Sequence, residues 1–255
     1  MNDHHFPFSL KKHFDTNGFV EATEFIRGSE LTELLSNVDR FIQTVVPLLS
    51  PEQVFYEDKQ NPATLKQIQQ MGEHDPWFAD LFNHGRFREL AEVLLDGSVV
   101  PKNMQYFNKP PSVGQPTPPH QDGHYFMLEP CEAVTMWLAL DEVDEENGCV
   151  RYVSGSHVRG MREHAKTNTL GFSQGIVEYP SCQDLEDEIA CPAMPGDLLA
   201  HHAMTIHRAD ANQSPLRHRR ALGFIYYSER AKEDTVTHQA YQRNLSAEMK
   251  KRGKI

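Results

Sequence analysis

The triplet His120-Gln121-Asp122 combines residue types and a spacing that could bind a metal ion. In a β-strand, residues i and i+2 point to the same side, so a strand through this triplet would aim an imidazole and a carboxylate at one point. One further histidine would complete the two-histidine, one-carboxylate set that binds non-haem Fe(II) and leaves other coordination positions open. The alternative interpretation is a surface histidine and aspartate beside a turn, because such a triplet also arises by chance.

Residues 195–207, PGDLLAHHAMTIH, offer the second histidine. The Pro-Gly-Asp turn predicts the start of a strand, and His207 falls near the start of the next one. His201 and His202 are rival ligands, but adjacent residues of a strand point to opposite faces, so at most one of them faces the site. Further on, Arg219 heads another apolar strand. Its guanidinium would suit the distal carboxylate of a dicarboxylate ligand, which arginine binds with two parallel hydrogen bonds.

The elements before these motifs are expected to be helices. Apolar residues at helical spacing predict a helix over residues 31–45, with Ser29 as its N-cap and Pro47 beyond its end. The Asp75-Pro76 pair is typical of a helix start, with proline at the first helical position. A further apolar stripe over residues 87–94 predicts another helix.

From about Val99 onwards, short apolar segments separated by turn residues predict strands. The predicted strands are Asn103–Phe107, Ala133–Leu140, Cys149–Val153, Asp197–Ala200 and Ala221–Tyr227. Helices followed by strands indicate one α+β domain over residues 1–255, mainly β, with helices flanking a β-sandwich or barrel. We expect a helical part at about 1–98, a β core at about 99–230 and a polar, helical C-terminal tail.

Composition narrows the function classes. The formal net charge is −11, which disfavours binding to nucleic acid or to anionic membranes, since both need a basic surface. No apolar run approaches the ~18–20 residues that span a bilayer, and the first residues lack the apolar segment of a secretory signal. The four cysteines form no CxxC pair and suggest buried thiols in a reducing compartment. We therefore expect a cytoplasmic enzyme with a small-molecule substrate, whose oligomeric state stays open.

Four blocks of sequence resemble the phytanoyl-CoA dioxygenase family of Fe(II)- and 2-oxoglutarate-dependent oxygenases. The likeness runs from about Phe14 to Tyr227, and the blocks are FNKPP (107–111), HQDGHYF (120–126), NGC with GSH (147–157) and PGD through RRA (195–221). The resemblance implies a double-stranded β-helix, a jelly-roll and cupin-like core, with the helices packed on one side. It also implies His120, Asp122 and His207 as iron ligands, with 2-oxoglutarate and O₂ as co-substrates.

The same resemblance implies residues for the co-substrate and the substrate. Arg219 would anchor 2-oxoglutarate, with Arg217 left as a rival because the interval from His207 is one residue longer than in the family pattern. The other co-substrate positions would be Gln105, Lys66 and Trp137. Candidate substrate contacts are Arg208, His124 and Asn108. Arg208 stands where the family often has glycine, in a segment that also lacks a serine found in many members. The alternative interpretation of Arg208 is a surface charge. His124 could equally be a packed histidine.

The expected reaction is hydroxylation of a small, anionic metabolite such as an acyl-CoA, a phosphonate or a carboxylate, with release of succinate and CO₂. Asp122 favours hydroxylation over halogenation, because related halogenases have a small residue at this position. Two alternatives stay open: a non-oxidative cupin-type metal enzyme, and a non-catalytic sensor of 2-oxoglutarate or metal.

Overall fold

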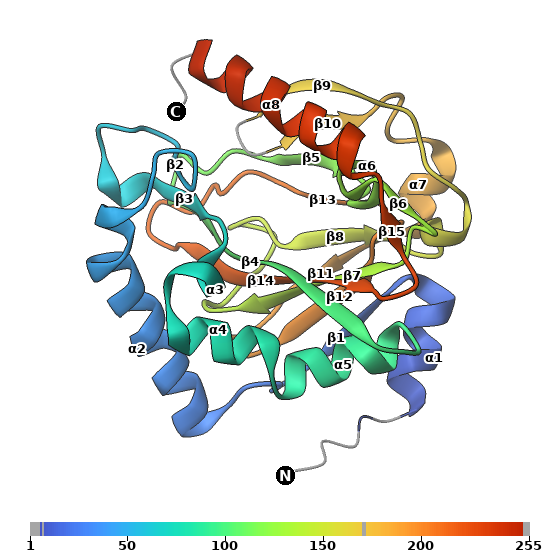
Figure 1. The fold of residues 1–255 in the computed structure, drawn as a ribbon, viewed down its shortest axis with the longest axis horizontal. Helices are drawn as coiled ribbons and strands as arrows, with labels where there is room; N and C mark the ends of the chain where they lie inside the picture. Colours follow the sequence, from blue (N-terminus) through green and yellow to red (C-terminus); the bar gives the residue numbers. More distant parts are fainter. Residues whose placement is uncertain (1–5, 7, 170–171, 252–255) are drawn as a thin grey trace.

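Two facing β-sheets with helices against one of them form the fold (Figure 1). The structure is a computed structural model that describes residue 6, residues 8–169 and residues 172–251. The helices are α1 Phe8–Asn17, α2 Gly28–Thr44, α3 Met71–His74, α4 Pro76–Asn83, α5 Arg86–Leu94, α6 Gly123–Phe126, α7 Cys182–Asp187 and α8 Thr235–Lys251. The strands are β1 Phe19–Ala22, β2 Val54–Tyr56, β3 Leu65–Ile68, β4 Val99–Lys109, β5 Thr117–His120, β6 Leu128–Glu129, β7 Ala133–Ala139, β8 Val150–Val153, β9 His164–Thr169, β10 Phe172–Ile176, β11 Glu188–Cys191, β12 Leu198–His202, β13 His207–Ala209, β14 Arg219–Ser228 and β15 Lys232–Glu233.

The larger sheet has the strand order β1-β12-β7-β14-β4-β3-β2, and the smaller one has the order β11-β8-β13-β5. The pairings within both sheets are antiparallel, and strands that are distant in the sequence lie side by side. This is the jelly-roll arrangement, so the predicted α+β, mainly β fold is confirmed.

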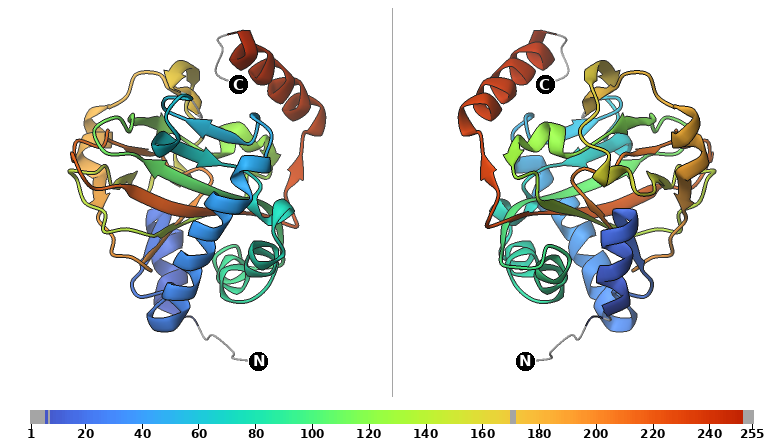
Figure 2. Two further views of the ribbon diagram at one scale, coloured as in Figure 1. Left: turned by 90° about the vertical axis from the view of Figure 1, so that its left-hand side faces the viewer. Right: turned by 90° about the vertical axis from the view of Figure 1, so that its right-hand side faces the viewer.

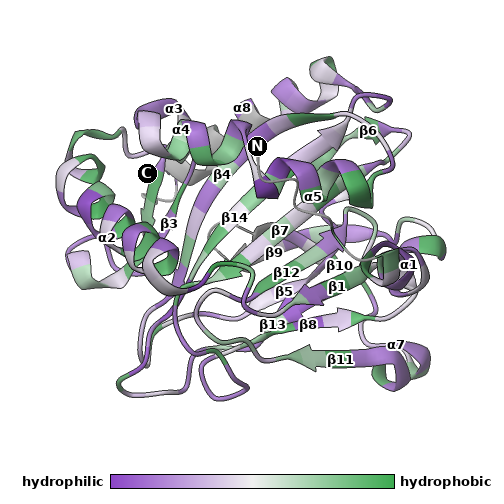
Figure 3. Cartoon of the chain, turned by 90° about the horizontal axis from the view of Figure 1, so that it is seen from below, coloured by the Kyte–Doolittle hydropathy of each residue, from purple (hydrophilic) through white to green (hydrophobic). Residues whose placement is uncertain are grey.

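Successive side chains of each strand point to opposite faces of the large sheet, so the two faces have different contacts. On β7, Val134, Met136 and Leu138 point to the helical side, where they join one hydrophobic core with side chains of α2, α4 and α5. Thr135 and Trp137 point to the opposite side, into the space between the sheets. The three helices lie on the same side of the large sheet (Figure 2), and their hydrophobic and hydrophilic residues alternate along the chain (Figure 3). The space between the sheets holds a second hydrophobic cluster, which includes Trp137 and Tyr152, together with the polar residues that line a cavity.

The predicted helices are present, with one corrected start. Helix α2 begins at Gly28 with Arg27 as its N-cap, so Ser29 lies inside the helix and does not cap it. The Asp75 side chain does cap α4, because its Oδ1 accepts hydrogen bonds from the backbone of Trp77 and Phe78. The polar C-terminal segment forms α8 as expected.

The part expected to be helical also contributes strands β1, β2 and β3 to the large sheet. All residues of β3 are buried, so its sequence has no alternation that could reveal a strand. Strand β4 is longer than the predicted Asn103–Phe107, because it pairs with β14 along nearly its whole length. None of the helices in the described ranges is both long and apolar enough to cross a membrane.

Candidate metal and co-substrate site

His120 and His207 face each other across the ladder between β5 and β13. Their ring centroids lie 4.1 Å apart. The Nδ1 atom of each ring lies beside a backbone carbonyl two residues earlier, at 2.8 Å for Pro118 and 3.0 Å for Thr205. A carbonyl only accepts, so each Nδ1 carries the proton and each Nε2 has its lone pair, the form in which histidine binds a metal.

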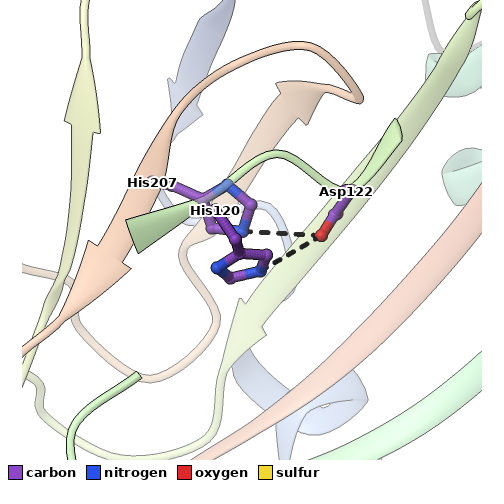
Figure 4. A group of neighbouring side chains, drawn as sticks. All are labelled: His120, Asp122 and His207. Carbon is purple, nitrogen blue, oxygen red and sulfur yellow. Dashed lines mark ion pairs between the residues drawn. The ribbon is translucent and has the colours of Figure 1, made fainter. Parts of the chain in front are cut away.

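Asp122 completes the group, although not by the strand geometry that the sequence predicted. Strand β5 ends at His120, and Asp122 has helical backbone angles as the residue before α6. Its Oδ1 atom lies 3.3 Å from Nε2 of His120 and 3.7 Å from Nε2 of His207 (Figure 4). One ligand atom from each residue lies within 4.8 Å of the others. Gln121 turns away and bonds the carbonyls of Gly160 and Met204.

The second oxygen of Asp122 is held by residues that the sequence analysis did not assign. Oδ2 accepts hydrogen bonds from the Thr135 hydroxyl at 2.6 Å and from His201 Nε2 at 3.1 Å. The Tyr152 hydroxyl lies 3.1 Å from Nδ1 of His201 and fixes the orientation of that ring. His202 points to the other face, toward His157. Pairing between β12 and β7 brings His201 opposite Thr135, and this pairing becomes visible only in the folded chain.

The electrostatics of the group favour the ligand forms of these side chains. Burial raises the pKa of the Asp122 carboxyl, but His207, His120 and His201 outweigh it and hold that pKa well below its usual range. Burial, reinforced by His120 and His201, holds the pKa of His207 well below its usual value, against the pull of Asp122. The group therefore presents a carboxylate and neutral imidazole at neutral pH, a donor set suited to Fe(II) and related divalent ions.

A cavity of about 600 Å³ contains this group and, farther along, Arg219. The Arg219 side chain is buried, its Nε donates to the Gly148 carbonyl at 2.9 Å, and its Cζ lies 4.9 Å from the Trp137 ring centroid. Among the described residues, no carboxylate lies within ion-pair distance of it. Burial lowers the pKa of Arg219 to about 10. A buried cation without a counter-charge is costly, so this end of the cavity is suited to an anion.

The rival arginine lies outside the cavity. Arg217 is paired on the surface with Asp144, at 2.8 Å, and with Glu146. The remaining predicted co-substrate residues all line the cavity with Arg219. Gln105 accepts a hydrogen bond of 2.7 Å from Gln67 Nε2, and Lys66 forms a 3.0 Å ion pair with Glu57.

The three candidate substrate contacts are already bound to the protein. Arg208 lines the cavity, but its Nε and Nη2 donate hydrogen bonds to Glu188 at 2.7 Å each. Its Nη1 donates to Asp210 at 2.6 Å. Asn108 also lines the cavity, with Nδ2 donating to the Leu65 carbonyl at 2.7 Å.

His124 does not line the cavity, and its contacts agree with the alternative of a packed histidine. It lies in the helical turn α6, where it bonds Gln174 Oε1 at 2.9 Å and stacks on His164 at 4.1 Å between centroids. Because this helical turn follows Asp122 directly, the two-residue spacing from Asp122 to His124 does not place both side chains on one side.

Comparisons with known proteins agree with this geometry. A family model described as phytanoyl-CoA dioxygenase matches residues 14–221. A phytanoyl-CoA dioxygenase of Arabidopsis thaliana is 29% identical over 185 residues, which cover 67% of this chain and 64% of that protein. A probable alpha-ketoglutarate-dependent hypophosphite dioxygenase of Stutzerimonas stutzeri is 23% identical, covering 79% of this chain and 72% of that protein. The alpha-ketoglutarate-dependent carbocyclase SnoK from nogalamycin biosynthesis shares the fold, with a TM-score of 0.71 at 22% identity over 90% of this chain and 87% of that chain.

Proposed function

This chain belongs to the phytanoyl-CoA dioxygenase family, and we propose on that premise that it uses Fe(II), 2-oxoglutarate and O₂ to hydroxylate a small molecule. The observation that carries the proposal is the presence, in one cavity, of His120, Asp122 and His207 together with the buried and unpaired Arg219. A metal centre alone would not need a buried cation beside it. A dicarboxylate that binds both the metal and the arginine accounts for both features.

The three proposed ligands fit iron by their chemistry. Two neutral imidazoles and one carboxylate form the set found in non-haem Fe(II) oxygenases, and they leave other coordination positions to small molecules. Bound iron with 2-oxoglutarate and O₂ supplies the oxidising power for C–H hydroxylation, with succinate and CO₂ as co-products. Hydroxylation rather than halogenation is part of the proposal, since Asp122 occupies the carboxylate position.

The protein's own residues position the reactants. Arg219 would bind the distal carboxylate of 2-oxoglutarate, with Trp137 beneath its guanidinium and Gly148 fixing Nε. Gln105 and Lys66, on neighbouring strands, would contact the same co-substrate. His201 and Thr135 hold Oδ2 of Asp122, so that Oδ1 faces the two histidines. The burial of these groups keeps bulk water away from the reaction.

The cellular setting is part of the same proposal. The four cysteines are free thiols, but only Cys149 and Cys191 are buried as expected, whereas Cys131 is partly exposed and Cys182 is exposed. Exposed thiols persist in a reducing compartment, which supports a cytoplasmic location.

The test is conversion of 2-oxoglutarate to succinate by the Fe(II)-loaded protein under air. We expect succinate formation that stops in His120→Ala and His207→Ala and persists in His202→Ala, whose side chain lies on the other face of β12. Metal and 2-oxoglutarate binding without any succinate would favour the sensor alternative. Metal binding without 2-oxoglutarate binding would favour the non-oxidative cupin-type enzyme.

A further inference from the structure

The cavity has two chemically different ends, and the register of the large sheet places them. At one end, Arg219 on β14 stands directly opposite Lys109 on β4. At the other end, Ile225 and Tyr227 of β14 line the cavity. Tyr227 lies eight residue steps along the strand from Arg219, about 26 Å at the usual rise. Thr135, which bonds Asp122, stands opposite Ile225, so the metal group lies nearer the second end.

The first end holds two basic side chains that have no carboxylate partner among the described residues. Arg219 and Lys109 are both buried, and within the described ranges neither has a carboxylate at ion-pair distance. This end therefore suits the dianionic co-substrate, in keeping with the proposed function.

The second end holds a cation whose charge is already neutralised. Lys102 is the extra residue of a bulge, because Ile225 pairs with Asn103 and Tyr226 with Pro101. The bulge lets Lys102 reach the cavity, where its Nζ lies 2.9 Å from Glu233 and 4.9 Å from the ring centroid of Tyr227.

Glu233 also lies 2.8 Å from His238 Nδ1, at the start of α8. The carboxylate thus neutralises the cation at this end and also contacts the helix that adjoins it. The charges at this end are balanced within the protein, and a substrate needs to supply none.

The remaining wall at this end combines the polar side chains of Gln70, Asn103 and His238 with a group of aromatic and aliphatic side chains. The members of that group are Tyr125, Phe126, Ile225, Tyr227 and Tyr241. The Tyr125 hydroxyl is occupied by the Gln174 backbone, with a 2.6 Å hydrogen bond to its carbonyl, so Tyr125 presents mainly its ring to the cavity. Tyr241 of α8 packs edge-on against Tyr125 at 6.3 Å, which brings α8 beside α6 (Figure 1). Such walls bind apolar rings and chains.

The nearby cations that could attract an anion are paired as well. Arg208 is bound by Glu188 and Asp210, and Lys66 by Glu57. With a formal net charge of −11, the whole molecule also repels anions at long range.

We propose that the prime substrate is a small molecule without net negative charge, which places an apolar ring or chain against the aromatic end of the cavity. This inference rests on the proposed function and names its substrate class, which differs from the anionic metabolite expected from the sequence because it excludes CoA thioesters and phosphate esters. The juxtaposition that carries it is the Lys102–Glu233 pair beside the rings of Tyr125, Tyr227 and Tyr241.

Three probes that share a cyclohexylmethyl carbon skeleton test the inference by calorimetric binding to the Co(II)-loaded protein saturated with 2-oxoglutarate, so that the end with Arg219 and Lys109 is already occupied. They are cyclohexylmethanol, cyclohexylmethyl phosphate and cyclohexanecarbonyl-CoA. We expect the alcohol to bind at least tenfold more tightly than either anion. Equal or tighter binding of an anion, or no binding of the alcohol, overturns the inference. Succinate formation without any probe is measured separately, so that failure of the proposed function is distinguished from failure of the substrate class.

A matched pair of variants tests the role of Glu233. Glu233→Gln leaves Lys102 without its carboxylate, and we expect it to bind cyclohexylmethyl phosphate at least tenfold more tightly than the wild type does. Glu132→Gln frees Arg230, whose 2.8 Å ion pair lies outside the cavity, and should bind the phosphate as the wild type does. No gain in Glu233→Gln, or an equal gain in Glu132→Gln, removes the electrostatic basis of the inference and overturns it.

Discussion

His201 donates a hydrogen bond from Nε2 to Oδ2 of Asp122 across 3.1 Å, so the two histidines of the metal group face the other oxygen of that carboxylate. The direction of the bond follows from Asp122, because a carboxylate only accepts and Nε2 of His201 must therefore carry the proton. Nδ1 of His201 is then left to accept from the Tyr152 hydroxyl, which lies 3.1 Å away.

Removing this hydrogen bond should weaken metal binding. We expect His201→Leu to raise the Co(II) dissociation constant by about 10- to 100-fold, the usual cost of losing a group that orients a metal ligand. Anaerobic titration followed by the visible spectrum of Co(II) measures it. His201→Gln keeps a donor and should recover part of the affinity, and His202→Leu should bind Co(II) normally. Wild-type affinity in His201→Leu would show that Thr135 alone positions Asp122.

Arg219 and Arg217 should differ sharply in their effect on 2-oxoglutarate binding. Arg219→Met removes the cation from the cavity, and we expect a loss of about 2–5 kcal/mol, by analogy with truncated buried charge pairs. Arg217→Met breaks a surface pair with Asp144 and should change binding little. The measurement is the 2-oxoglutarate dissociation constant of each variant, and the reverse ranking would assign the anchor to Arg217.

Binding of 2-oxoglutarate should take up a proton at Lys109. Burial, together with Arg219 and Lys66, holds the pKa of Lys109 well below its usual value in the empty cavity. A dianion beside it raises that pKa, so between the two pKa values the complex holds one more proton than the free protein. Affinity should therefore rise as pH falls through that window. Calorimetry in buffers of different ionisation enthalpy detects the uptake, which Lys109→Met should abolish; no uptake in the wild type would contradict the prediction.

Gly148 should not tolerate a side chain. Its φ of +88° lies in the region that favours glycine, and a Cβ would stand 2.4 Å from the Asp210 carbonyl oxygen. We expect Gly148→Ala to lower the free energy of unfolding by about 1–3 kcal/mol, the usual cost of such strain. Because the Gly148 carbonyl accepts from Arg219, weaker 2-oxoglutarate binding should accompany the loss. Gly160→Ala is the control, since nothing lies within 4 Å of a Cβ there although φ is also positive. Equal destabilisation of both variants would mean that the positive φ alone causes the loss and that the contact with the Asp210 carbonyl contributes nothing.

The sequence predicted the residues of the metal group but not the geometry that joins them. The blocks around His120, Asp122, His207 and Arg219 carried enough pattern to place all four in one site. The i, i+2 rule predicted that His120 and Asp122 point to one site, and they do. The geometry differs from the prediction, since Asp122 directly precedes a helical turn and is not part of a strand.

The residues that sequence reasoning left unassigned are those whose roles depend on pairing between distant strands. Thr135 and Tyr152 reach the site from β7 and β8, and neither has a local motif. The pairing of Lys102 with Glu233 could not be predicted from the sequence either. The two residues come together only because β14 pairs along β4 and ends near the start of that strand. The sequence analysis expected an anionic substrate, whereas the folded chain pairs Lys66, Lys102 and Arg208 at the cavity with acidic side chains.

The direct pairing of His120 with His207 makes the proposed ion a cross-link between two strands of the smaller sheet, with α6 attached through Asp122. An ion that binds only the folded chain stabilises it by RT ln(1 + [M]/Kd), about 2.7 kcal/mol at a free concentration of 100 Kd. The midpoint of thermal unfolding should thus rise with the concentration of Co(II), which carries out no turnover in the absence of co-substrate. In a cell short of iron, the metal-free protein would be the less stable species and the one more exposed to proteolysis, which couples the abundance of this enzyme to the supply of its metal.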